Sequence, residues 1–301
     1  MSPDPEPPAG DAVAVFQMHR GMLLGLAYRL LGSFADAEDV VQAAWLRWSD
    51  TDRTVIEAPN RFLVTVVTRL SIDMMRLAHR RRETYVGPWL PEPVHNGDMR
   101  SLEPADTVAQ RETLSLAMLR IMQQLSAPER AVYVLREAFD LPYREIGEIL
   151  GLSDANARQL HRRAAGHLNT GQDRFATDPE IHRDLVERFL FAARTGERDA
   201  LEGLLARDVT LWADGGGRAS TALRPVTGAE RVSRLMIGAF AKRHPTGLIV
   251  QVNGQAGLLL QHDAEEVADV NVIAFEISGD LITGIQWMAN PDKLTKHGPV
   301  R

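Results

Sequence analysis

Residues 141–168 read LPYREIGEILGLSDANARQLHRRAAGHL, and this stretch sets the organisation of the chain. Apolar residues recur at helical spacing on both sides of Gly151, which predicts a short helix over 143–150 and a second over 154–168. Gly151 suits the left-handed residue that ends a helix, and Ser153 can cap the helix that follows. Gly147 is small where the two helices must approach closely. The spacing predicts a helix-turn-helix.

One side of the second helix is polar and basic. Arginine and glutamine can each make two hydrogen bonds to a base edge, and the remaining side chains can contact phosphate. The alternative is an ordinary helical hairpin with a solvated basic face, and the motif alone leaves both open. The candidate DNA contacts on this helix are Asn156, Arg158, Gln159, His161, Arg162 and Arg163.

Composition narrows the class of protein. A chain of 301 residues is long enough for roughly two or three domains. It contains no cysteine, which excludes disulfides and thiolate metal sites. The net charge of −6 argues against indiscriminate coating of nucleic acid, although basic residues cluster at 76–82 and 158–163. No secretory signal or membrane-spanning run is evident, so we expect a cytoplasmic protein without membrane association.

The first third of the chain is expected to be helical, over about 16–31, 34–48 and 60–82, with a loop over 49–60. Ser33 is a plausible cap, and Asp36, Glu38 and Asp39 place three acids in the first turn of the second helix. Acids suit the positive end of a helix. The sharper interpretation is that this acidic tip, beside Trp45, docks a basic partner surface.

Between the first helices and the helix-turn-helix lies a proline-rich segment over 87–105, which we expect to be an extended linker. Helical periodicity then runs from about 106 to 168. Ser126 and Glu129 form the capping pattern of a helix start.

After residue 178 the pattern becomes α+β. Helices are expected over 180–195, 200–205 and 232–241. Strands are expected over 209–213, 248–252, 258–261, 269–277 and 281–288, as an antiparallel meander.

Three segments together resemble the extracytoplasmic-function sigma factors of RNA polymerase. ADAEDVVQ at 35–42 resembles the core-binding motif of region two, and 60–82, with SIDMMR at 71–76, resembles the segment that follows it. Residues 125–168, opening with LSAPERAV, resemble region four. The order and spacing of these motifs are more specific than any one of them. The resemblance covers roughly the first 170 residues.

This resemblance implies a non-enzymatic subunit whose partners are core RNA polymerase and promoter DNA, with no cofactor and no metal. Polymerase binding falls on Asp36, Glu38, Asp39, Gln42 and Trp45. Downstream promoter contacts fall on Asn60, Arg61, Arg69, Arg76, Arg80 and Arg81. Upstream contacts fall on the helix-turn-helix residues given above. The free chain is expected to be a monomer.

The rest of the chain is similar to one subfamily, whose C-terminal extension resembles polyketide cyclases of the SnoaL and nuclear-transport-factor-two type. The marks are WLPEP at 89–93, DGGG at 214–217 and NPDKL at 290–294, with Arg218 where the family usually has lysine. The resemblance implies a cone-like α+β domain that replaces a separate anti-sigma protein. Its interdomain residues are Trp89, Leu90, Pro91, Asp214, Gly215, Gly216, Gly217, Arg218, Asn290, Pro291, Asp292 and Lys293.

The expected organisation is therefore multidomain: region two over 1–86, linker over 87–105, region four over 106–170, and the extension over 178–301. An alternative is a cyclase, isomerase or ligand-sensing domain fused to a helix-turn-helix regulator, and another is a dimeric repressor. Acid–base candidates in the extension show no recognisable catalytic spacing, and fold alone carries no function. They are Asp208, Asp214, Asp269, His244 and His262. An unknown small ligand in the pocket of the extension stays open.

Overall fold

The structure, a computed structural model, describes residues 12–82, 84–94, 102, 113–168, 178–262 and 269–294. The chain divides into two compact units. The helical unit comprises Met1–Arg80, Gly97–Thr113 and Met122–His167. The sheet unit comprises Arg81–Asn96, Leu114–Ile121 and Leu168–Arg301, so it includes part of the linker as well as the extension. No helix in the described ranges has the length and apolar character needed to cross a bilayer.

The N-terminal part of the helical unit contains α1 (Ala12–Leu31), α2 (Phe34–Asp50), the short 3-10 helix η1 (Arg53–Val55) and α3 (Pro59–Arg82). Ser33 caps α2 as predicted, because its hydroxyl accepts the backbone N–H of Asp36 at 3.2 Å. Trp48 is fully buried, and its indole N–H donates to the carbonyl of Ala12 at 2.9 Å. This bond fixes the end of α2 to the start of α1.

The helices that follow are α6 (Leu116–Met122), α7 (Ala127–Glu137), α8 (Tyr143–Leu150) and α9 (Asp154–Leu168). The predicted capping box is present, since the Glu129 carboxylate accepts the backbone N–H of Ser126 at 3.1 Å. Gly151 has a φ of 69°, and a methyl group at Gly147 would lie 2.6 Å from the carbonyl of Leu152. The helix-turn-helix is therefore confirmed, with both glycines required by the backbone.

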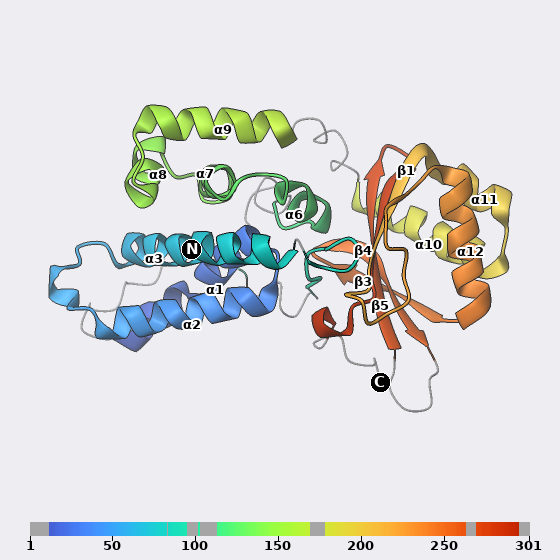
Figure 1. Ribbon diagram of the computed structural model, residues 1–301, viewed down its shortest axis with the longest axis horizontal. Helices are drawn as coiled ribbons and strands as arrows, with labels where there is room; N and C mark the ends of the chain where they lie inside the picture. The colour runs from blue at the N-terminus through green and yellow to red at the C-terminus, as the bar shows by residue number, and fades with distance from the viewer. Residues whose placement is uncertain are drawn as a thin grey trace. The chain divides into compact units, whose positions relative to one another are not determined.

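The extension begins with α10 (Pro179–Thr195) and α11 (Arg198–Gly203). The elements that follow are β1 (Leu205–Asp214), β2 (Val226–Thr227), α12 (Ala229–Arg243), β3 (Thr246–Val252), β4 (Gln255–His262), β5 (Asp269–Ser278), β6 (Leu281–Met288) and the 3-10 helix η4 (Pro291–Lys293). In Figure 1, α10, α11 and α12 lie on one side of the sheet. The sheet order is β2-β1-β6-β5-β4-β3. This confirms the α+β expectation for the extension.

The sheet departs from the prediction at β1. Strands β3 to β6 form the expected antiparallel meander, but β1 pairs with β6 in parallel, with Leu211 opposite Ile285. The cause is the long connection through β2 and α12, which lets the last strand return beside the first in the same direction. Leu205, expected at the end of a helix, opens β1 instead.

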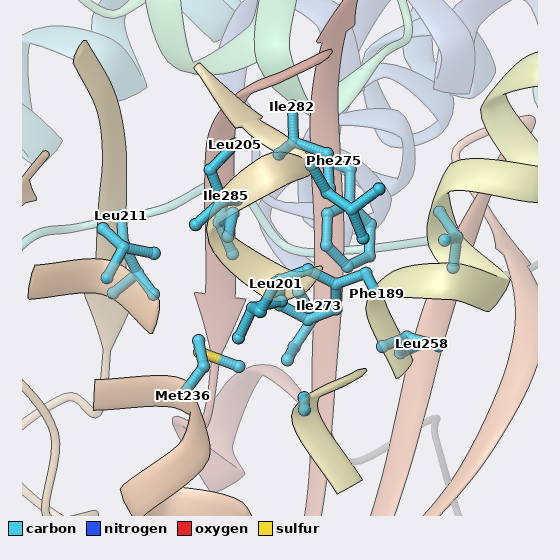
Figure 2. Packing of buried hydrophobic residues seen from close by; sticks show 14 of the residues in the cluster. Phe189, Leu201, Leu205, Leu211, Met236, Leu258, Ile273, Phe275, Ile282 and Ile285 are labelled. Atoms are coloured by element: carbon cyan, nitrogen blue, oxygen red, sulfur yellow. The ribbon is translucent and has the colours of Figure 1, made fainter. Parts of the chain in front are cut away.

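Alternation along the strands separates two faces of the sheet. One face builds the apolar core with α10, α11 and α12, where the rings of Phe189 and Phe275 meet edge to face at 4.9 Å (Figure 2). Trp212, Asp214 and Glu276 alternate with core residues and therefore point to the opposite face. That opposite face receives the linker.

Candidate polymerase, promoter and linker sites

A groove of about 500 Å³ lies between α1 and α2. Its lining includes Glu38, Asp39, Gln42 and Trp45, four of the five predicted polymerase-binding residues. Trp45 packs edge to face on Phe16 at 5.1 Å, so an aromatic wall stands beside the acids. The lining combines apolar side chains with the two acids and one basic residue, Arg20, as a mixed apolar and polar contact surface would require.

The predicted position of the acids needs one correction. Helix α2 begins at Phe34, so only Asp36 lies in its first turn, and Glu38 and Asp39 follow in the next. The helix dipole acts mainly within the first turn and therefore accounts for Asp36 alone. Glu38 and Asp39 line the groove instead, which strengthens their interpretation as partner contacts.

The basic helix α3 carries the predicted downstream promoter residues. Asn60, Arg61, Arg69 and Arg76 are exposed; the side chains of Arg80 and Arg81 lie outside the described residues. Two of these arginines meet the first helix of the helix-turn-helix.

Arg61 forms an ion pair with Glu148 on α8. Arg69 donates to the carbonyl of Ile149 at 3.0 Å. These contacts engage two of the cationic groups that were predicted to contact promoter DNA.

Two buried arginines join α1 to α7. Arg130 donates twice to the carbonyl of Arg29, at 3.0 and 2.9 Å, near the C-terminal end of α1 where helix carbonyls lack internal partners. Arg29 in turn donates to the hydroxyl of Thr113 at 2.9 Å, and burial lowers the pKa of Arg29 to about 10. In the sequence, the available signal is Arg29 itself, a single arginine within the apolar run 23–31.

On the recognition helix α9, Asn156, Arg158, Gln159, Arg162 and Arg163 are exposed, whereas His161 is half-buried. Arg158 makes two bonds to Asp154, at 2.9 and 2.8 Å, one turn earlier.

The ring of His161 lies 2.9 Å from a Glu137 oxygen and 3.2 Å from the Tyr143 hydroxyl. It also stacks on Tyr133 at 5.8 Å. The bond from His161 lowers the pKa of the Glu137 carboxyl. The structure thus gives His161 a role inside the helix-turn-helix, which leaves less of its ring to meet a base.

Asp214 lies at the end of β1, is fully buried and accepts hydrogen bonds from Tyr85 and Leu90. One oxygen accepts the Tyr85 hydroxyl at 2.6 Å and the Gly216 N–H at 3.1 Å. The other accepts the backbone N–H of Leu90 at 2.8 Å and the ammonium of Lys293 at 2.7 Å. Burial and the neighbouring Asp214 raise the pKa of Tyr85, which stays a neutral donor. Of these four donors, the Tyr85 hydroxyl and the Leu90 N–H join residues 85–90 to β1.

Lys293 completes this arrangement from the other side. Its ammonium also donates to the carbonyl of Leu90 at 2.6 Å and lies 3.8 Å from the centre of the Trp89 ring. Pro91, which follows, is buried. We call Asp214, Gly216, Asn290 and Lys293 the linker cradle, since they hold residues 85–90.

The glycine turn leaves room for the cradle. Gly216 has a φ of 58°, and a methyl group there would lie 2.4 Å from the amide nitrogen of Asn290. That amide donates to the Tyr85 hydroxyl at 2.8 Å. Gly217 has a φ of 72° and faces Val86, just before the linker, and Gly215 has no room for a methyl group beside Thr221. Glycine is thus required by filled space at 215 and 216 and by the backbone conformation at 216 and 217.

Arg218 bonds Asp292 at 2.8 Å, and both are exposed, so this pair contributes little. Pro291 opens η4 and is exposed.

Asn253 is a contact that sequence reasoning missed. Its side chain accepts the N–H of Val94 at 2.9 Å and donates to the carbonyl of Leu114 at 2.7 Å, while its own N–H donates to Val94 at 2.9 Å. Asn253 has a φ of 50° in the turn between β3 and β4. The Asn-Gly pair at 253–254 is typical of such hairpins, and it was the available signal.

Among the described residues, the acid–base candidates do not form a catalytic arrangement. Asp214 is engaged by four donors, two of them from residues 85–90, and His244 follows α12 with a φ of 43°. Asp208 is exposed on β1. The side chains of His262 and Asp269 lie outside the described residues. Over the part of the chain that the structure describes, no three His, Asp or Glu side chains group as metal ligands would.

Comparison with known proteins gives consistent matches. Residues 15–82 match the family described as Sigma-70 region 2, and residues 115–168 match Sigma-70, region 4. The chain is 38% identical over 293 residues to the ECF RNA polymerase sigma factor SigJ of Mycobacterium tuberculosis, covering 94% of this chain and 93% of that protein.

It is 31% identical over 287 residues to the probable ECF RNA polymerase sigma factor SigI of the same organism, covering 93% and 94%. The crystal structure of M. tuberculosis SigJ aligns with a TM-score of 0.77 and 34% identity, over 96% of this chain and all of that one.

Proposed function

Because this chain belongs to the extracytoplasmic-function sigma factors of RNA polymerase, we propose that its C-terminal extension regulates initiation by holding the linker. The sigma factor itself is a non-enzymatic subunit that binds core RNA polymerase and directs transcription initiation at promoter DNA. Regulation by the extension takes the place of a separate anti-sigma protein.

In this proposal each region of the chain has the role that its site supports. Region two, over 1–86, binds core polymerase through the groove between α1 and α2 and contacts the downstream promoter element through α3. Region four, over 106–170, reads the upstream element in the major groove with α9. The segment over 87–105 joins them, and the extension over 178–301 holds part of it. We place the free chain in the cytoplasm, where core polymerase acts, as a monomer.

The observation that carries this proposal is the burial of Asp214 against four donors. A buried carboxylate is tolerated only while its hydrogen-bond donors and its cation stay in place, because burial disfavours an unpaired charge. Two promoter-reading modules on a tether bind together only at a suitable separation. Holding or releasing residues 85–90 would change that separation. A ligand would shift the balance only by its difference in affinity for the two states.

The alternative, a cyclase or isomerase fused to a regulator, requires an acid–base residue that is free to exchange a proton with substrate. Asp214, the most buried acidic candidate, is engaged by Tyr85, Leu90 and Lys293. That engagement favours a structural role. A small ligand in the extension would therefore act on regulation, not as a substrate.

The test is reconstitution with core RNA polymerase, with sequencing of transcript starts. The unmodified chain should confer initiation at defined promoters. Asp214→Asn should change the yield at those promoters at least about fivefold, the lower range of ordinary coupling between sites. Glu187→Gln, on an exposed pair with Arg183, is the control and should leave the yield unchanged. Equal yield from Asp214→Asn and the parent would refute regulation through the linker.

A further inference from the structure

A second buried carboxylate, Glu276 on β5, lies on the sheet face that receives the linker. It is 1% exposed, and its neighbours Phe275 and Ile277 point into the apolar core on the other face. Gly284 lies opposite it on β6, where a methyl group would come within 2.7 Å of the carboxyl carbon. The sheet therefore leaves space for this carboxylate where an alanine on β6 would fill it.

The partner of Glu276 is Arg120 on α6. Its Nε and Nη2 donate to Glu276 Oε1 at 3.0 and 2.8 Å, and its side chain is 13% exposed. The guanidinium also lies 3.7 Å from the centre of the Trp212 ring. Gln286 adds a bond of 3.1 Å to the same oxygen. Planar stacking combined with two N–H donors is a geometry that arginine provides and lysine does not.

Arg120 supplies the counter-charge of Glu276. Its second oxygen, Oε2, has no hydrogen-bond partner in the described part of the chain, and Gln286 is neutral. A buried carboxylate needs a compensating cation, because burial strongly disfavours the charged form. Arg120 is thus the group that makes a charged Glu276 tolerable at this position.

Helix α6 opens the segment that matches region four, yet residues 114–121 belong to the sheet unit. With seven residues, α6 is too short to be stable alone, so its position depends on packing. Asn253 holds Leu114, just before the helix. Glu276 holds Arg120, near its end. Both ends of the segment are therefore held by the extension.

We propose that Glu276 is an anchor through which the extension holds the first helix of region four, separately from the hold of Asp214 on residues 85–90. The proposal rests on regulation by the extension and adds a second attachment to it. Glu276 pairs with Gly284, and Asp214 with Met288, so the two carboxylates lie about 13 Å apart along β6. At that separation each contact can be broken without removing the other.

Hydrogen exchange of the full chain, followed by mass spectrometry, tests this independence. Glu276→Gln should raise the exchange of amides in α6 about 10-fold or more, because it leaves Arg120 buried without its counter-charge. Peptides covering residues 84–94 should keep their protection. Asp214→Asn should show the reverse pattern, with loss of protection in residues 84–94 and little change in α6.

Two further variants keep the test decisive. Arg120→Met changes no residue of the sheet and removes the same ion pair from the helix side, so it should also raise the exchange of α6. Arg120→Lys should give an intermediate gain, because the charge stays but stacking and the second donor are lost. Glu187→Gln, which removes a carboxylate from an exposed pair with Arg183, should change neither segment.

Unchanged α6 exchange in both Glu276→Gln and Arg120→Met would overturn the anchor. Equal loss of protection in α6 and residues 84–94 from every variant would overturn its independence. Transcription separates the two proposals. If Glu276→Gln releases α6 but yields with core polymerase match the parent for this variant and for Asp214→Asn, the anchor stands and regulation fails.

Discussion

The chain uses the same chemical pair, an aspartate beside a cation, in two regions with opposite consequences. On the recognition helix, Arg158 and Asp154 are both well exposed, with side chains 57% and 43% accessible. In the linker cradle, Lys293 is 12% and Asp214 0% accessible. An exposed pair opens at little cost and can give its arginine to DNA. A buried pair cannot open without leaving an unpaired charge in the protein interior, which solvates charge far less well than water does.

The comparison extends to the units as wholes. The helical unit carries exposed charged side chains along α2, α3 and α9, and it buries Arg29 and Arg130 between α1 and α7. The sheet unit has exposed ion pairs on its helices, and it buries Asp214 and Glu276, which hold segments of the same chain.

The largest effect should come from Asp214→Asn, which keeps the size of the side chain but removes its charge. We expect the free energy of unfolding of the sheet unit to fall by about 3–5 kcal/mol, as when one partner of a buried pair is lost. Denaturant titration followed by tryptophan fluorescence measures it. Asp292→Asn, on the exposed pair with Arg218, should cost no more than about 0.5 kcal/mol. Equal losses would remove the contrast between the two regions.

Two left-handed glycines offer a second comparison. Gly216→Ala meets the side chain of Asn290 as well as an unfavourable φ, so we expect a loss of about 2–3 kcal/mol. Gly151→Ala in the helix-turn-helix meets only the unfavourable φ, with nothing within 4 Å, and should lose about 1 kcal/mol. Thermal unfolding of both variants measures the difference. If Gly151→Ala costs as much, packing in the cradle is weaker than its geometry indicates.

The next prediction concerns the groove between α1 and α2, whose residues we propose to bind core RNA polymerase. Trp45→Ala should weaken binding to core RNA polymerase by about 2 kcal/mol, roughly 30-fold, because it removes an aromatic anchor beside the acids. Fluorescence anisotropy of a labelled chain measures the affinity. Leu46→Ala, a 57% exposed neighbour outside the groove lining, is the control. A larger effect from Leu46→Ala would move the docking site to another face of α2.

A smaller effect is expected from Arg158→Ala. Affinity for promoter DNA should fall about 10-fold, because one arginine lost from a base or phosphate contact typically costs this much. Thermal stability should stay near that of the parent, since Arg158 is exposed. Footprinting and a melting curve of the same preparation measure both quantities. A variant that loses stability while its footprint is unaltered would assign Arg158 to the fold.

The smallest effect concerns pH. His182 on α10 is buried, its ring bonds the carbonyl of Ala256 at 2.9 Å, and burial lowers its pKa below the usual 6.5. The unfolded chain therefore takes up this proton first. The contribution of His182 to stability is complete above about pH 6.5 and is lost as pH falls through its lowered pKa. His182→Gln should flatten the pH dependence of unfolding below 6.5, whereas an unchanged slope would exclude His182 as its source.

Local signals in the sequence were sufficient for much of the fold. Gly151 and Ser153 predicted the turn of the helix-turn-helix, because caps and left-handed glycines depend on a few adjacent residues. The three marked segments around Trp89, Asp214 and Asn290 were predicted to act together by resemblance. Their geometry, four donors on one carboxylate, was not accessible from the sequence.

The parts that sequence reasoning missed depend on distant partners. The parallel pairing of β1 with β6 is set by a crossover, not by either strand alone. Glu276 sits in an apolar strand pattern that gives no indication of Arg120, which is 156 residues away. Arg29 and Arg130 likewise become explicable only when α1 and α7 meet. Buried charged residues that meet across a long sequence separation produce no periodic pattern in the sequence, so periodicity does not predict them.

The cradle joins Leu90 to Lys293, positions 203 residues apart. A ribosome adds about 5–20 residues per second, so the lysine enters the growing chain roughly 10–40 s after the leucine. During that interval the N-terminal helices can already fold while the group that restrains the tether has not been made. Every newly synthesised copy therefore passes through a period in which Leu90 is not held, and this period ends only after translation has passed Lys293.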